Sequence, residues 1–141
     1  MVMRSSDAEW RGDLKSGKGT MRLGSGAFEG SYSFPSRFES GQGTNPEELI
    51  AAAHAGCYSM AFSHGLASAG HTPTSVRTTA RVHLEQSGGG FAITRIELDC
   101  QAQIPGVDEA TFQKLAEEAK KGCPVSKALT GTEITLNATL V

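Results

Sequence analysis

Two segments near the middle of the chain alternate strictly between apolar and polar residues. Every second position is apolar or Thr in residues 76–85 and apolar or Cys in residues 95–104. A period of two is that of a β-strand with one buried face. The loop Ser87-Gly88-Gly89-Gly90 joins the two segments. We therefore expect an antiparallel hairpin with one solvated face and one packed face.

The first third of the chain also predicts short strands, which Gly and Ser turns separate. Residues 10–14 and 19–23 flank the turn 15–18 and favour a hairpin. Residues 28–34 favour a third strand that ends at Pro35. A glycine-bearing loop, residues 39–44, then leads to a helix.

Residues 49–76 contain no Asp, Glu, Lys or Arg, although 20% of the chain is charged. The start of this helix is marked by Asn45 as N-cap, Pro46 at the first helical position and two acidic residues in the first turn. We expect the helix to run over residues 46–69, to end at Gly70 and to be buried on most of its faces.

The last third predicts a second helix over residues 108–121, a short helical turn over residues 123–129 and a final strand over residues 133–141. The order of elements is strands, helix, strands, helix, strand. This order predicts an α+β protein with mostly antiparallel sheets around two main helices. A length of 141 residues suits a single domain, residues 1–141.

The composition argues against nucleic-acid and membrane partners. The 13 Lys and Arg residues are scattered and the net charge is -2, so no basic stripe is available to follow phosphates. Histidines, glycines and serines dilute the uncharged stretch too much for a membrane span. Residues 1–15 are charged and contain no apolar run, so no signal peptide is expected and the protein is predicted to be cytoplasmic.

Three cysteines, an odd number without an export signal, do not suggest a disulfide scaffold, so each thiol needs its own explanation. Cys100 shares the apolar face of its strand and is expected to be a packing group. Cys123 begins a helical turn, where free backbone N–H groups stabilise a thiolate, but the role of a poor N-cap fits equally well. Cys57 lies too far along its helix for that effect, and burial would raise its pKa. A reactive Cys57 therefore needs a cation that its own helix cannot supply, and taken alone it favours an inert role.

A metal site is the alternative use of these thiols. His54 lies one turn before Cys57 on the same helix face, and His64 lies two turns after it. His54, Cys57 and Cys123 could supply three zinc ligands. No paired-Cys or paired-His spacing accompanies them, and a lone helical His is usually a hydrogen-bonded packing group. We therefore expect neither a metal nor a cofactor.

Two stretches of the chain resemble the cysteine motifs of the OsmC/Ohr family. The first comprises Arg37-Phe38-Glu39, residues 43–49 (GTNPEEL) and residues 52–60 (AAHAGCYSM), and the second comprises residues 122–126 (GCPVS). Residues 91–94 and 133–136 also fit, so the similarity covers nearly the whole chain. The Arg-Phe-Glu ahead of the first long helix is similar to the OsmC branch rather than to the organic hydroperoxide resistance branch.

This resemblance implies a thiol-dependent peroxidase that reduces organic hydroperoxides, and hydrogen peroxide less well, in defence against oxidative and osmotic stress. It implies an intertwined homodimer with its active sites at the subunit interface. Cys57 would be the peroxidatic thiol, Cys123 the resolving thiol, Arg37 the missing cation and Glu47 the carboxylate that orients it. The two cysteines would form a disulfide, which an external dithiol reopens, and the family suggests lipoylated proteins for that role.

The aromatic and Met side chains near these motifs have two interpretations. Met60, Phe62, Tyr58, Phe34 and Phe38 could line a site that favours organic hydroperoxides, or they could belong to an ordinary core. Two other functions also stay open at this point. One is a ligand-binding or metal-binding dimer with incidental thiols, and the other is a related scaffold whose cysteines sense redox changes.

Overall fold

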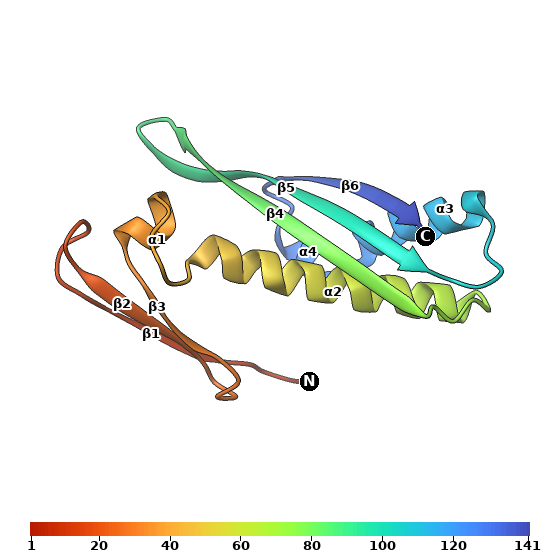
Figure 1. Ribbon diagram of the computed structural model, residues 1–141, viewed down its shortest axis with the longest axis horizontal. Coiled ribbons are helices and arrows are strands. Elements are labelled where there is room, and N and C mark those ends of the chain that lie inside the picture. Colours follow the sequence, from red (N-terminus) through yellow and green to blue (C-terminus); the bar gives the residue numbers. More distant parts are fainter. The chain divides into compact units, whose positions relative to one another are not determined.

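The structure, a computed structural model, describes all residues 1–141 and divides them into two compact units, Met1–Leu49 and Ile50–Val141. The first unit contains a three-stranded antiparallel sheet in the order β1-β2-β3, followed by a short helix, α1 (Figure 1). Its elements are β1 Ser6–Arg11, β2 Lys18–Leu23, β3 Glu29–Tyr32 and α1 Phe34–Phe38. The single domain over residues 1–141 stays a prediction.

Strand β1 lies earlier in the sequence than predicted. It covers Ser6–Arg11, whereas the pattern predicted a strand over residues 10–14. Gly12 has a φ of 94°, in the left-handed region that favours glycine. The carboxylate of Asp13 accepts hydrogen bonds from the amide and the hydroxyl of Ser16, at 2.7 and 2.5 Å. These bonds form a turn where the apolar residues had suggested a strand.

Helix α1 lies where the sequence pattern predicts the end of a strand at Pro35. The chain instead turns at Ser33, which forms a reciprocal capping box with Ser36. The amide of Ser33 donates to Oγ of Ser36 at 2.8 Å, and the amide of Ser36 donates to Oγ of Ser33 at 3.3 Å. Pro35 lies in the first turn, where its missing N–H group costs nothing.

Helix α2 comprises Pro46–Ser68, as the cap signal predicted. The amide of Glu48 donates to Oδ1 of Asn45 at 2.7 Å, which confirms the N-cap. The carboxylate of Glu48 accepts from the hydroxyl of Thr44 at 3.0 Å instead of closing a capping box. The chain leaves the helix through Gly70, whose φ is 89°, as expected for a C-terminal stop.

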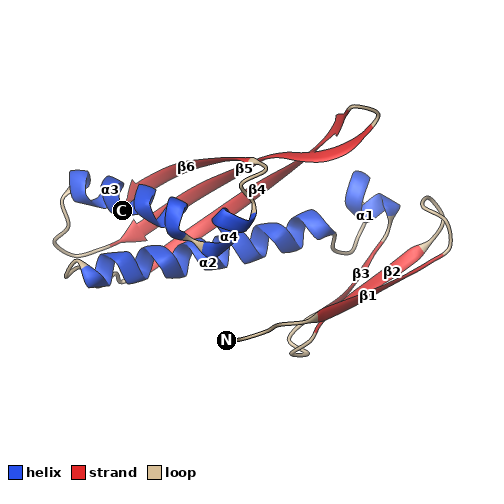
Figure 2. Ribbon diagram, turned by 180° about the vertical axis from the view of Figure 1, so that it is seen from behind, coloured by secondary structure: helices blue, strands red, loops and turns tan.

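The second unit contains a mixed sheet in the order β4-β5-β6, with helices on its apolar face (Figures 1 and 2). Strands β4 and β5 form the predicted antiparallel hairpin, and β6 pairs with β5 in parallel. A parallel neighbour requires a crossover, which α3 and α4 supply. None of the four helices has the length and apolar character that a membrane crossing requires. The elements are β4 Ser75–Ser87, β5 Gly90–Gln103, α3 Glu109–Gly122, α4 Pro124–Ala128 and β6 Glu133–Leu140.

The core of the second unit lies between α2, α3 and the sheet. Phe62 of α2 is fully buried between Tyr58 and Phe112, with ring centroids 5.7 and 5.4 Å apart. The Tyr58 hydroxyl donates to the carbonyl of Ala116 at 3.0 Å, so its polar end is satisfied. Cys100 is fully buried in the same core, which confirms its packing role. Each large apolar side chain buried here contributes about 1.5–3 kcal/mol.

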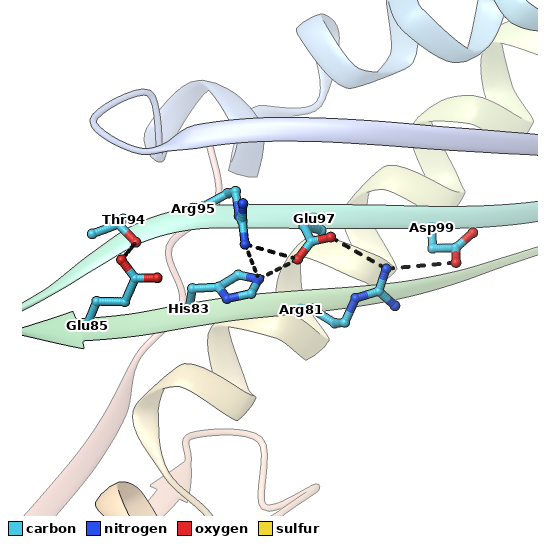
Figure 3. Close-up of polar contacts among 7 residues, drawn as sticks. All are labelled: Arg81, His83, Glu85, Thr94, Arg95, Glu97 and Asp99. Carbon is cyan, nitrogen blue, oxygen red and sulfur yellow. Dashed lines mark hydrogen bonds and ion pairs between the residues drawn. The ribbon is translucent and has the colours of Figure 1, made fainter.

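The other face of the β4–β5 hairpin is polar, as its alternation predicted. Arg81 and His83 on β4 and Arg95 on β5 surround the carboxylate of Glu97, and Arg81 also approaches Asp99 (Figure 3). Such cross-strand pairs of opposite charge help to hold the register of the hairpin.

Candidate active site

The two cysteines of the family-like motifs lie against each other in the second unit. Cys57 projects from α2, and Cys123 is the N-cap residue of α4. Their Sγ atoms are 2.7 Å apart, and both thiols are free. Cys57 is half-buried and Cys123 is fully buried. A disulfide bond is about 2.05 Å long, so it would require only a small shift of these side chains.

The position of Cys123 follows from the junction of two helices. This residue ends α3 and begins α4, and its φ of -60° and ψ of 122° are extended rather than helical. Pro124 follows at the first helical position, which suits its fixed φ and missing N–H group. The first amides of a helix have no partner within the helix. The amides of Val125 and Ser126 therefore remain available to the two sulfurs.

The surroundings act differently on the two thiols. Burial raises the pKa of Cys57, and its contact with Cys123 raises it further. Burial also opposes ionisation of Cys123, but hydrogen bonds from Cys57 and from the amide and hydroxyl of Ser126 bring the pKa of Cys123 below its usual range. The second unit by itself thus favours a thiolate on Cys123. A thiolate on Cys57 needs a further positive charge.

A second polar pair, His54 and Ser126, joins the same two helices. Nε2 of His54 lies 2.7 Å from Oγ of Ser126, and both side chains are buried. Nδ1 of His54 is buried without a hydrogen-bonding partner in the protein. No group of three or more His, Cys, Asp or Glu side chains is arranged to hold a metal ion. In this arrangement His54 contacts Ser126, and Cys57 contacts Cys123.

The buried His54 is expected to make the fold sensitive to acid. Burial lowers the pKa of His54, so below pH ~6.5 the unfolded chain binds a proton that the folded chain resists. This contribution to stability is intact above pH ~6.5 and falls by up to about 1.4 kcal/mol per pH unit below it. Urea unfolding at pH 7.5 and 5.5 should show a smaller acid-induced loss in His54→Gln than in the wild type. The control His64→Gln, at an exposed position of α2, should keep the wild-type loss, and an unchanged loss in His54→Gln would contradict the assignment.

Arg37 and Glu47, the other two predicted site residues, form an ion pair in the first unit. Nη2 and Nε of Arg37 donate to the Glu47 carboxylate at 2.8 and 3.2 Å. Glu47 is 7% exposed and lies in the first turn of α2, and Arg37 lies on α1. Two donors of one guanidinium on one carboxylate fix its plane. The predicted pairing is confirmed, whereas the roles of both residues remain predictions.

A pocket of about 240 Å³ opens beside Arg37 in the first unit. Phe34 and Phe38 line it, with their ring centroids 4.9 Å apart. The guanidinium carbon of Arg37 lies 5.3 Å from the centroid of the Phe38 ring, a cation–π contact. The remaining lining residues are Trp10, Leu14, Tyr32 and Ser33.

The aromatic and Met residues predicted near the site fall into three groups. Tyr58 and Phe62 belong to the core, and Met60 is 76% exposed on the outer side of α2. Only Phe34 and Phe38 line the pocket beside Arg37.

Most of this chain matches known proteins. The family model described as OsmC-like protein matches residues 39–138. The chain is 50% identical to Peroxiredoxin OsmC of Escherichia coli (strain K12), over 96% of this chain and 95% of that protein. It is 36% identical to the Organic hydroperoxide resistance protein of Xanthomonas axonopodis pv. citri (strain 306), over 68% and 67% of the two chains.

A solved structure also matches the fold. The crystal structure of an organic hydroperoxide resistance protein from Elizabethkingia anophelis superimposes with a TM-score of 0.74 at 28% identity, and the match covers 99% of each chain. Sequence and fold agree over almost the full length. The chain belongs to the OsmC family.

Proposed function

We propose that this protein is a cysteine-based peroxidase that reduces organic hydroperoxides to alcohols, with Cys57 as the peroxidatic thiol and Cys123 as the resolving thiol. The observation that carries the proposal is the 2.7 Å separation of the two sulfurs across α2 and α4. The names of the relatives, a peroxiredoxin and organic hydroperoxide resistance proteins, support the same chemistry. Stress defence in the cytoplasm is the biological role that we propose.

The first step requires a thiolate, because a neutral thiol is a weak nucleophile. The Cys57 thiolate attacks the terminal oxygen of the hydroperoxide, the O–O bond breaks, and the alkoxide takes up a proton to become the alcohol. Cys57 keeps the transferred oxygen as a sulfenic acid. The positive charge that Cys57 lacks in the second unit is assigned to Arg37.

Arg37 suits this role for two chemical reasons. Its guanidinium is always charged, so it can offset the cost of forming a thiolate in a water-poor site. It also carries several N–H donors, which can stabilise charge on the leaving alkoxide. Glu47, bound to two of these donors, would hold the guanidinium in one orientation.

In the second step Cys123 condenses with the sulfenic acid to form a disulfide and water. The disulfide protects Cys57 from irreversible oxidation. An external dithiol must then reopen it by thiol exchange, and we propose a lipoylated protein as the physiological donor. No metal and no organic cofactor enters these steps.

The pocket beside Arg37 supports a preference for organic hydroperoxides. Apolar side chains dominate its lining, so it can accept a hydrocarbon tail. Burial of such a tail favours binding by about 25 cal/mol for each Å². Hydrogen peroxide has no tail and gains nothing from this surface.

We propose that the active molecule is a homodimer with its sites at the subunit interface. The outer surface of α2 supports this assembly. It exposes small side chains and Met60 and bears no Asp, Glu, Lys or Arg beyond the first turn. A helix face of this composition is suited to close approach by a second helix.

Mass spectrometry of intact and digested protein tests the proposed function. One equivalent of cumene hydroperoxide added to the reduced protein is expected to remove two hydrogens and to link Cys57 to Cys123, with Cys100 still a free thiol. Hydrogen peroxide should do so more slowly. Thiols that stay reduced, or a different pair of linked cysteines, would refute the assignment.

A further inference from the structure

The three strands of the first unit build one side of the pocket beside Arg37. Trp10 on β1 and Tyr32 on β3 both pair with Gly19 of β2, which lies between them. A Cβ atom on Gly19 would overlap both rings, so glycine at this position lets the two rings approach each other. Their centroids are 5.2 Å apart, and both rings line the pocket. The sheet therefore fixes this aromatic side of the pocket in place.

The turn between β1 and β2, residues 12–17, brings one further apolar side chain to the pocket. Leu14 is the only aliphatic residue in the lining, which otherwise consists of four aromatic side chains, Ser33 and Arg37. It is 58% exposed, so it contributes little to the core of the unit. Its apolar surface is available to a molecule that enters the pocket.

Hydrogen bonds on both sides of Leu14 hold this turn in one conformation. The indole Nε1 of Trp10 donates to the carbonyls of Gly12 and Asp13, at 3.1 and 3.2 Å. The Asp13 carboxylate accepts from the amide and the hydroxyl of Ser16, at 2.7 and 2.5 Å. The turn is thus a pre-organised wall of the pocket, and a ligand does not have to order it on binding.

We infer that Leu14 is a specificity-determining residue that selects hydroperoxides with a compact branched or aromatic tail, an inference that rests on the proposed peroxidase function. The pocket volume of about 240 Å³ lies below the roughly 300–1,000 Å³ of pockets that accept drug-sized ligands, so it suits a small hydrocarbon group. The aromatic side chains contact this group, and Leu14 adds an aliphatic contact from the turn. Asp13 is a positioning residue, because it fixes the turn that carries Leu14.

The expected effect follows from the apolar contact that Leu14 provides. Leu14→Ala removes the side chain beyond Cβ, and the loss of roughly 40 Å² of shared apolar surface weakens binding about fivefold. This contact acts on the tail and not on the reacting oxygens, so the loss should appear in KM, with kcat unchanged. Hydrogen peroxide has no tail and should react with the variant as it does with the wild type.

Steady-state consumption of peroxide, with dithiothreitol as donor, tests the inference on the full-length protein. The value of kcat/KM is measured for cumene hydroperoxide, tert-butyl hydroperoxide and hydrogen peroxide. Leu14→Ala should lower it about fivefold for cumene hydroperoxide, less for the smaller tert-butyl compound, and not at all for hydrogen peroxide. Leu14→Met keeps an apolar side chain of similar volume and should retain the wild-type preference. Leu23→Ala, at the end of β2 and outside the pocket, is the matched control and should keep the ratio of the three values.

Asp13→Ala tests the turn without changing a residue that lines the pocket. It removes both hydrogen bonds to Ser16, so that Trp10 alone holds the turn. The preference for cumene hydroperoxide over hydrogen peroxide should fall about two- to threefold, the cost of ordering one side chain again on binding. In a Leu14→Ala background the same substitution should have no further effect, since no side chain remains to be positioned. Additive losses in the double variant would contradict the positioning role of Asp13.

Two results would overturn the role of Leu14 while leaving the peroxidase function in place. One is a Leu14→Ala variant with the wild-type preference for cumene hydroperoxide over hydrogen peroxide. The other is an equal loss of kcat/KM with all three peroxides, which would assign Leu14 to folding or to subunit assembly. If the wild type consumes none of the three peroxides, the proposed function itself is rejected.

Discussion

Cys57→Ser is expected to abolish the reduction of organic hydroperoxides. A serine hydroxyl does not ionise near neutral pH and cannot form a sulfenic acid, so neither step of the cycle can proceed. Loss of a covalent nucleophile should lower turnover at least about 10³-fold. The measurement is the consumption of cumene hydroperoxide with dithiothreitol as donor, at equal concentrations of wild type and variant.

Cys100→Ser provides the matched control for this experiment. It removes the same functional group from a site in the core, where the thiol acts as a small apolar group. The control is expected to lose some thermal stability and to keep its turnover. A Cys57→Ser variant with wild-type turnover would show that another group reduces the peroxide, and the assignment of Cys57 would then be wrong.

The sequence predicted those elements whose signals are local. Each of these signals lies within a short stretch of sequence. They are the N-cap at Asn45, the helix stop at Gly70 and the alternation in β4 and β5, and the structure confirms all of them. The turn after β1 depends on hydrogen bonds that the Asp13 carboxylate accepts from Ser16. The spacing of apolar residues does not reveal such bonds. Helix α1 has a local signal that apolar periodicity does not reveal, the capping box of Ser33 and Ser36.

Contacts between distant segments were harder to predict. The alternation of residues 133–141 predicts a strand, but it does not say that β6 pairs with β5 in parallel. The sequence predicted that His54 is a hydrogen-bonded packing group. The residues around it did not predict that its partner is Ser126. That contact exists because α4 packs beside α2, with Cys123 and Cys57 as the other half of the same contact. The resemblance to the family identified the two cysteines, and only the structure shows the pair beside them.

Arg37→Met is expected to slow the oxidation of Cys57 by about 10²–10³-fold. The substitution removes the cation that we assign to the Cys57 thiolate, and burial would then hold the pKa of Cys57 above its usual range. The substitution should also shift the pH dependence of the oxidation rate in a defined direction. Because the thiolate form becomes scarcer, the rate of the variant should rise as pH increases and reach half of its maximum at a higher pH than in the wild type. Arg37→Lys should recover only part of the rate, since an ammonium group lacks the planar fork that binds Glu47.

The chain offers a matched control for the loss of an arginine. Arg22 forms an exposed ion pair with Asp7 in the same unit, at 3.0 Å, so Arg22→Met removes the same charge and a similar contact. Single-turnover rates of peroxide consumption should be measured for all variants in a Cys123→Ser background, where the first step is isolated from the second. Arg22→Met should keep the rate and the pH profile of its parent. If Arg37→Met also keeps both, the positive charge at Cys57 comes from elsewhere, because a buried thiol with no cation beside it cannot remain reactive near neutral pH.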